Sequence, residues 1–311
     1  MARIGLIDCD GHGFPNIPLM KLSAYHKKQG DEVEWYDPWK GIIEPYTKVY
    51  VSKVFSFTAD YNAPIYAENV SGGGTGYAIK NDNGIEVYHK ELDPSLPSEI
   101  EHIYPDYSLY PSLTADHSFG FLTRGCPRGC DFCHVAPKEG RRSYKTADLD
   151  EFWKGQKNIT LCDPNILACK DHRDLLQQLV DSKAWIDLNQ GVDIRLVSDS
   201  NIDLIRQLKI KCFHFAYDRI EDKDLVEPKL KMFKEATGYN RGKVMVYILS
   251  NFNTTIEEDL HRIYFCRELD FQPYVMLYDK ERCDAEHRHL QRWVNNPYIF
   301  WKTPRFEDYK P

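Results

Sequence analysis

Short apolar runs alternate with helical patterns from about residue 118 onward, and this alternation constrains the fold more than any other feature. The runs are rich in β-branched, aromatic or other apolar residues and occupy residues 118–123, 158–161, 185–188, 212–216, 244–249 and 273–277. Between them apolar residues recur at helical spacing, as in Leu175, Leu176 and Leu179. A strand followed by a helix, repeated about every 25 to 40 residues, is typical of parallel βα units. The spacing therefore predicts an α/β fold with six strands in an open, partial (βα)6 barrel that resembles a shortened TIM barrel, because eight units would need more chain.

Polar residues follow each predicted strand. They are the cysteine-rich loop after the first run, Asp163 and Asn165 after the second, Gln190, Asp193 and Arg195 after the third, Tyr217-Asp218-Arg219 after the fourth, Ser250-Asn251 after the fifth and Tyr278-Asp279-Lys280 after the sixth. In parallel barrels the reactive groups gather where the strands end. The pattern therefore predicts a functional site at that end of the barrel.

The loop after the first run, Cys126-Pro127-Arg128-Gly129-Cys130-Asp131-Phe132-Cys133, holds three cysteines at C-x3-C-x2-C. Three thiolates at such spacing can ligate three irons of a [4Fe–4S] cluster. No fourth cysteine follows at ferredoxin spacing, so one iron would keep a coordination position for a non-protein ligand. A zinc site is the alternative, but its only nearby fourth ligand, His134, is adjacent to Cys133 and cannot easily converge with it on one tetrahedral ion.

The segment from Gly120 to Cys133, GFLTRGCPRGCDFC, closely resembles the cluster loop of radical S-adenosylmethionine (radical SAM) enzymes, in which the residue before the last cysteine is usually aromatic, as Phe132 is here. The resemblance implies that Cys126, Cys130 and Cys133 bind a [4Fe–4S] cluster and that S-adenosylmethionine chelates the open iron. It further implies an enzyme that cleaves S-adenosylmethionine reductively to a 5′-deoxyadenosyl radical. That radical would functionalise a substrate, which the sequence does not identify, by C–H activation or methyl transfer. A low-potential electron donor such as flavodoxin or ferredoxin would be a partner.

The remaining cofactor contacts are assigned to residues after the second and third strands. Arg195 is a candidate for the cofactor carboxylate, because a guanidinium can bind it bidentately. Asp163 and Asn165 stand where many family members carry a glycine-glycine-glutamate segment that holds the amine. Gln190 and Asp193 are candidates for the ribose hydroxyls, and Phe132 for apolar contact near the adenine.

Structural roles stay open for several of these residues. A plain ion pair between Arg195 and Asp193 is one alternative, and a helix N-cap is the alternative for Asp163. Cys162 and Cys169 could donate a hydrogen atom, accept a methyl group or help to hold a second cluster, but buried cysteines commonly serve only as small apolar residues. No catalytic residue beyond the cluster ligands is predicted.

The first hundred residues predict a separate, small α/β domain. Strands are expected near residues 3–9, 32–36 and 49–58, a helix near 18–30, and a glycine-rich turn at 71–76. This order resembles a shortened Rossmann-like cobalamin-binding domain of radical SAM proteins, although Asp10-Gly11-His12-Gly13 matches the cobalt-ligand motif only in part. Cobalamin is thus a minor candidate cofactor. The predicted boundaries are 1–102 for this domain, 103–117 for a linker, 118–283 for the barrel and 284–311 for a C-terminal extension.

Composition limits the classes of partner and the cellular location that we expect. The net charge of −7 disfavours broad nucleic-acid binding without excluding it. No run of about twenty apolar residues predicts a membrane span, and nine cysteines without secretory features predict a reducing, cytoplasmic location. The alternative to an enzyme is an iron–sulfur redox sensor or a structural cluster-binding module that leaves S-adenosylmethionine intact.

Overall fold

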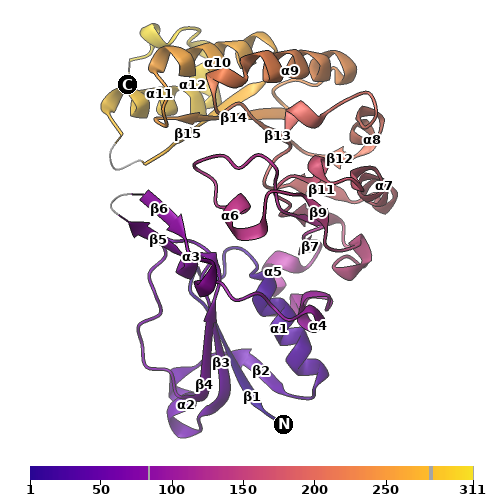
Figure 1. The fold of residues 1–311 in the computed structure, drawn as a ribbon, viewed down its shortest axis with the longest axis vertical. Coiled ribbons are helices and arrows are strands. Elements are labelled where there is room, and N and C mark those ends of the chain that lie inside the picture. The colour runs from indigo at the N-terminus through magenta and orange to yellow at the C-terminus, as the bar shows by residue number, and fades with distance from the viewer. Residues whose placement is uncertain (83–84, 280–282, 311) are drawn as a thin grey trace. The chain divides into compact units, whose positions relative to one another are not determined.

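A computed structural model describes the chain except for residues 83–84, 280–282 and 311. It shows a mixed α/β protein with parallel sheets, as predicted, and the chain forms two compact units, residues 1–160 and 161–311 (Figure 1). Lys280, expected after the last strand, lies outside the described residues. None of the described helices is both long enough and apolar enough to cross a membrane.

The first unit is built on a four-stranded parallel sheet in the order β2-β1-β3-β4 (Figure 1). Its strands are β1 (Arg3–Asp8), β2 (Glu32–Trp35), β3 (Tyr46–Ser52) and β4 (Ala67–Gly73), and its helices are α1 (Ile17–Lys28) and α2 (Pro38–Ile43). Asn16 caps α1 by accepting a hydrogen bond from the Leu19 amide at 3.2 Å. A Cβ on Gly5 would lie 3.0 Å from the Val49 side chain, so a larger residue here would require that side chain to shift.

The rest of the first unit consists of short elements around the cysteine loop. They are α3 (Thr75–Ala78), β5 (Ile79–Asp82), β6 (Ile85–Tyr88), α4 (Ser98–Glu101), α5 (Pro111–Thr114), β7 (His117–Gly120), β8 (Thr123–Arg124), α6 (Val135–Glu139), β9 (Tyr144–Lys145) and β10 (Asn158–Leu161), whose last residue opens the second unit. Strands β5 and β6 form one antiparallel pair, and β8 and β9 form another.

The second unit continues the strand–helix alternation. Its elements are α7 (His172–Ser182), β11 (Trp185–Leu188), α8 (Ile202–Gln207), β12 (Lys209–Ile210), β13 (Phe213–Ala216), α9 (Lys223–Thr237), β14 (Val244–Ser250), α10 (Ile256–Glu268), β15 (Gln272–Leu277), α11 (Ala285–Asn295) and α12 (Pro297–Lys302). Strands β13, β14 and β15 are parallel, and α9, α10 and α11 lie along one face of their sheet (Figure 1). That face is apolar, since Val244, Val246 and Ile248 are fully buried. Thr255 and Glu258 form a capping box at the start of α10.

Five of the six predicted strands after residue 118 match β10, β11, β13, β14 and β15 to within about one residue at either end. The first is shorter than predicted. Strand β7 ends at Gly120, where a Cβ would lie 2.4 Å from the Phe152 ring. Thr123 then pairs with Lys145 in a separate antiparallel ladder. Closure of these strands into a partial barrel stays a prediction, as do the domain boundaries at 102, 117 and 283.

Two expectations for the first hundred residues are corrected. The strand expected at 49–58 is β3, which ends at Ser52 because the Asp10 carboxylate binds the amides of Val54 and Phe55. The glycine-rich turn expected at 71–76 is reduced to Gly74, since residues 71–73 complete β4 and Thr75 begins α3.

Candidate functional site

The cysteine loop lies in the first unit, between the β8 strand and helix α6. Cys126, Cys130 and Cys133 are all partly buried. The Cys133 amide donates to the Cys130 carbonyl at 2.9 Å, and the Cys126 amide donates to the Gly140 carbonyl at 3.2 Å. The loop is therefore a tight turn whose first cysteine is tied to the residue after α6.

Two glycines are required for this turn. Gly125 and Gly129 have φ of +78° and +59°, a backbone region that favours glycine. A Cβ on Gly125 would lie 2.2 Å from the Arg142 carbonyl oxygen. A Cβ on Gly129 would lie 2.8 Å from the guanidinium carbon of Arg141, so this side chain lies directly against the cysteine loop.

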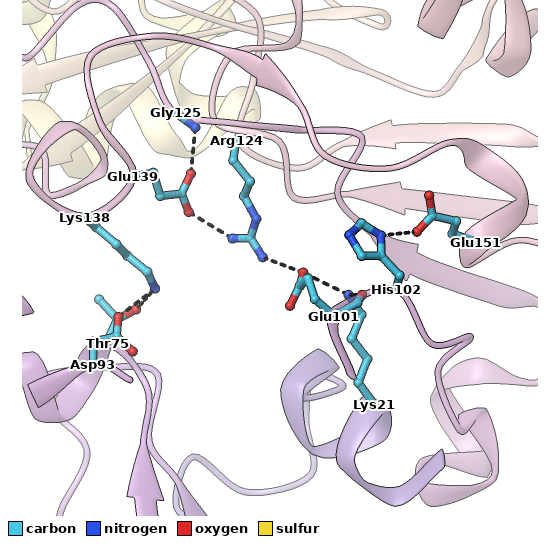
Figure 2. Close-up of polar contacts among 10 residues, drawn as sticks. All are labelled: Lys21, Thr75, Asp93, Glu101, His102, Arg124, Gly125, Lys138, Glu139 and Glu151. Atoms are coloured by element: carbon cyan, nitrogen blue, oxygen red, sulfur yellow. Dashed lines mark hydrogen bonds and ion pairs between the residues drawn. The ribbon is translucent and has the colours of Figure 1, made fainter. Parts of the chain in front are cut away.

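Glu139, the last residue of α6, holds the start of the loop. Its carboxylate accepts a hydrogen bond from the Gly125 amide at 2.9 Å and forms an ion pair with Arg124 at 2.9 Å (Figure 2). Arg124 also lies over the Phe121 ring, 3.4 Å from its centroid. The residue directly before Cys126 is thereby fixed through both its backbone and its neighbour.

Ionic contacts reach this region from the first hundred residues (Figure 2). Lys138 hydrogen-bonds to Thr75 and forms an ion pair with Asp93 at 3.2 Å. On the other side, Glu101 bridges Lys21 at 3.0 Å and Arg124 at 3.9 Å. Both ends of the segment that carries the cysteines are thus anchored to the part of the chain that precedes it.

The residues of the loop fit an iron–sulfur cluster. Three reduced thiols lie within eight residues on a turn that glycine makes possible, and cationic side chains stand beside them. Each thiolate ligand adds negative charge to a cluster and reduction adds more, so the nearby guanidinium of Arg141 suits such a group. Phe132, expected near the adenine, is partly buried in the same turn. His134, the alternative zinc ligand, faces Glu86 instead, with its Nε2 at 3.2 Å from that carboxylate.

The other predicted site residues lie in the second unit. Asp163 and Asn165 are both buried, in the loop after β10, and Asp163 begins no helix there. The Asn165 amide nitrogen lies 3.5 Å from the Asp193 carboxylate. Gln190 is exposed in the turn after β11. The structure therefore brings Asn165, Asp193 and Arg195 together.

Arg195 forms the ion pair that the sequence left open as an alternative. Its Nε donates to Asp193 at 2.7 Å, and its Nη1 donates to Asp222 at 3.1 Å. Asp193 also accepts from the Arg195 amide at 3.2 Å, which caps a short 3₁₀ turn. A cofactor carboxylate would thus have to share Arg195 with two acidic residues, so these three residues form an anionic cluster rather than a simple anion site.

Asp218, after β13, is a buried acid with a perturbed pKa. Its carboxylate accepts from the Leu249 amide at 3.3 Å. Burial raises the pKa of Asp218 to about 6, against the opposing attraction of Arg262. A carboxyl group that changes charge near neutral pH at the end of a strand can hold or release a proton there.

Not every polar strand end is available for a ligand. Ser250 hydrogen-bonds to Asp259, and the fully buried Arg262 pairs with Asp259 and donates to the carbonyls of Tyr217 at 2.7 Å and Leu249 at 3.0 Å. These contacts are internal and bind the ends of β13 and β14 to α10. The prediction that all the strand-end polar groups serve a site is therefore too broad.

The secondary candidates occupy varied surroundings. Cys169 is buried and Cys162 partly buried. His12 stacks on Trp35 with ring centroids 4.2 Å apart, and cobalamin binding stays a prediction. Cys283, Asp284 and His287 place possible ligand atoms within 4.8 Å of one another, but Asp284 caps α11 through the amide and ring of His287, which accounts for the arrangement.

Three residues that shape these sites were not predicted from the sequence. Glu139 and Lys138 close the cysteine loop, and Asp222 completes the cluster with Arg195. None stands in a motif, and their partners lie 14 to 63 residues away along the chain. Near Lys138 and Glu139 the sequence shows only a cluster of charged residues, which continues in the adjacent cations Arg141 and Arg142.

Comparison with known proteins gives two weak structural matches. No family model matches the chain, and no curated protein matches it. Among solved structures, SuiB of Streptococcus suis matches with a TM-score of 0.36 and 14% identity over 47% of this chain and 37% of SuiB. SuiB bound to S-adenosylmethionine matches with a TM-score of 0.42 and 15% identity over 71% of this chain and 53% of SuiB. The chain spans about half of SuiB or less, and at these scores its function is argued from its own residues.

Proposed function

We propose that the chain is a radical SAM enzyme that binds a [4Fe–4S] cluster through Cys126, Cys130 and Cys133. The observation that carries the proposal is the cysteine loop itself: three thiols at C-x3-C-x2-C on a turn fixed by Gly125 and by the carboxylate of Glu139. Three protein ligands leave one iron for a small molecule, which distinguishes a reactive cluster from a structural one. When bound, the cluster would supply one electron at low potential to S-adenosylmethionine.

The chain's own residues have the tasks of binding and orientation. Asp163, Asn165, Gln190 and Asp193 offer acceptors and amide donors for the amine and ribose of S-adenosylmethionine, and Phe132 offers apolar contact. Arg195 holds Asp193 in place and can give one of its remaining N–H groups to the cofactor carboxylate. The anionic side chains of Asp193 and Asp222 also favour a cofactor that carries a sulfonium and an ammonium group.

The reaction class is left at C–H activation or methyl transfer on an unidentified substrate. An electron donor such as flavodoxin or ferredoxin, a cytoplasmic location, a barrel over residues 118–283 and a Rossmann-like domain over residues 1–102 belong to the same proposal. Cobalamin is a minor part of it, because the motif around His12 is incomplete.

The decisive experiment is the formation of 5′-deoxyadenosine by anaerobically reconstituted protein with dithionite and S-adenosylmethionine. Cys130→Ala is the control, since it removes one cluster ligand. We expect product from the wild type only. A fully assembled cluster that binds S-adenosylmethionine but never cleaves it, with or without cell-extract substrates, would contradict the proposal.

A second candidate is an iron–sulfur redox sensor or structural cluster module. The specific observation in its favour is that Arg195 and the ends of β13 and β14 are already engaged in internal contacts. A sensor would assemble the cluster and change its conformation or partner on oxidation. It would show no measurable affinity for S-adenosylmethionine, which isothermal titration calorimetry tests directly.

A further inference from the structure

The exposed charges of the segment that carries the cysteine loop are opposite in sign to the net charge of the whole chain. The chain carries a net charge of −7. Between Cys126 and Lys145, by contrast, the exposed charged residues are Arg128, Arg141, Arg142 and Lys145 against a single acid, Asp131. We call these four cations the basic rim.

The basic rim is fixed to the same backbone as the thiols. Arg128 lies within the loop, between Cys126 and Cys130. The guanidinium of Arg141 lies against Gly129, and the Arg142 carbonyl lies against Gly125. Arg141 and Arg142, which follow these glycines by 12 and 17 residues, therefore lie next to the cysteine loop.

The same segment carries an exposed aromatic side chain. Tyr144 is 46% exposed and lies on β9, between Arg142 and Lys145 in the sequence. Lys145 forms an ion pair with Asp148 at 2.6 Å, so it contributes less charge than the arginines. Arginine and tyrosine are both enriched in protein-binding patches, in which apolar contact gives affinity and charge gives orientation.

The position of the rim indicates what binds there. A cluster that must be reduced before each turnover needs a protein that approaches its ligands closely and leaves again. Opposite charges steer such transient encounters and raise their association rates 10- to 1000-fold or so. Nucleic acid fits less well, because stable binding usually neutralises about 6 to 10 phosphates and the chain as a whole is acidic.

We propose that the basic rim is the docking surface for an acidic one-electron carrier protein of the flavodoxin or ferredoxin type. This inference rests on the proposed function. In the complex one electron leaves the reduced flavin or iron–sulfur centre of the carrier and enters the cluster held by the three thiolates, and no bond is formed or broken.

The test compares a charge-reversed rim with a matched control. Arg142→Glu/Lys145→Glu reverses two cations that are not among the proposed cluster ligands. The control, Lys211→Glu, reverses an exposed lysine of the second unit. The first readout is the Kd for oxidised flavodoxin, measured by calorimetry at low ionic strength, which needs no turnover. The second is the kcat/KM for flavodoxin in 5′-deoxyadenosine formation, beside the rate with saturating dithionite.

We expect the double variant to bind flavodoxin at least about tenfold more weakly and to lose a similar factor in kcat/KM. The dithionite rate should not change, and the wild-type affinity should fall steeply with salt while that of the variant should not. Arg142→Gln/Lys145→Gln should give an intermediate loss, and equal iron content would show that both variants keep the loop intact.

The failures are distinguishable. A wild-type Kd that ignores both salt and the charge reversal would overturn the docking surface even if dithionite supports product formation. A lack of product with dithionite, together with charge-dependent flavodoxin binding, would contradict the enzyme and not the surface. Rim-dependent binding of a single-stranded oligonucleotide at physiological salt, with flavodoxin unaffected, would assign the rim to nucleic acid instead.

Discussion

Glu139 should control how firmly the cysteine loop is held, and Glu139→Ala tests this. The carboxylate makes two charge-assisted contacts, one with the Gly125 amide and one with Arg124, each at 2.9 Å. The side chain of Glu139 is only 12% exposed and that of Arg124 only 22%. Alanine removes both contacts and keeps the helix, because it is a good helix former.

The size of the effect follows from these contacts. A hydrogen bond to a charged group contributes about 1.5–3 kcal/mol when shielded from water. Water can replace part of each contact here, and Arg124 keeps its second carboxylate, Glu101, at 3.9 Å. We therefore expect the loss to total about 2–3 kcal/mol, which corresponds to local opening of the loop that is about 30 to 160 times more frequent.

Hydrogen exchange at the Cys126 amide measures this opening directly. That amide donates to the Gly140 carbonyl at 3.2 Å, so it is protected only while the loop is closed. Its protection factor should fall by the same factor, and the variant should retain less iron after reconstitution. Glu139→Gln keeps one acceptor and should restore part of the protection.

The matched control is Glu91→Ala, which removes a carboxylate that is 71% exposed and paired with His89 at 3.2 Å. Exposed ion pairs contribute little to stability, so protection and iron content should not change. If Glu139→Ala leaves the Cys126 amide as protected as in the wild type, the ionic contacts do not hold the loop, and the reasoning from Figure 2 is wrong.

Three further predictions concern the loop and the second unit. Arg195→Ala should weaken binding of S-adenosylmethionine about tenfold in calorimetry, and unchanged affinity would remove Arg195 from the site. Gly129→Ala places a Cβ 2.8 Å from the Arg141 guanidinium at a φ of +59° and should lower iron content more than the control Gly72→Ala, whose added Cβ on β4 meets nothing within 4 Å and requires no left-handed backbone. The pKa of Asp218, about 6, lies above the ordinary carboxyl value, so its contribution to stability is complete below pH 4 or so and is lost as the pH rises through 6. Asp218→Asn should therefore remove a decline of up to about 3 kcal/mol in the unfolding free energy between about pH 4 and 7, and an unaltered pH profile in denaturant titrations would contradict the raised pKa.

Local sequence predicted the elements that local physics determines. Strand β10 is buried on both faces and reads as a short apolar run at residues 158–161. In β11 buried Ile186 and Leu188 alternate with exposed residues, the period of a half-buried strand. The capping box at the start of α10 is equally local, since Thr255 and Glu258 are three residues apart.

Strand ends set by distant side chains could not be predicted. The apolar run at 49–58 continues beyond Ser52, but the carboxylate of Asp10, more than 40 residues earlier, takes the next two free amides out of the sheet. The first strand after residue 118 stops where Phe152 packs on Gly120, 32 residues away in sequence. In both places a tertiary contact overrides a local preference.

The candidate site divides in the same way. The ligands of such a cluster can be recognised from cysteine spacing, because the metal–sulfur geometry requires three thiols on one short turn. Cys126, Cys130 and Cys133 could therefore be predicted from the sequence. What keeps that turn in place has no such spacing. Glu139, Lys138 and Glu101 act through single ion pairs, and any acidic or basic residue of suitable reach could have taken each role.

The polar contacts around the cysteine loop give the part of the chain before residue 102 a structural role. Thr75 and Asp93 contact Lys138, and Glu101 contacts Arg124 (Figure 2). Whatever else that part of the chain binds, it supplies the counter-charges that hold Arg124 and Lys138 on either side of the loop. Its presence before the cysteines therefore has a physical reason that requires neither cobalamin nor substrate.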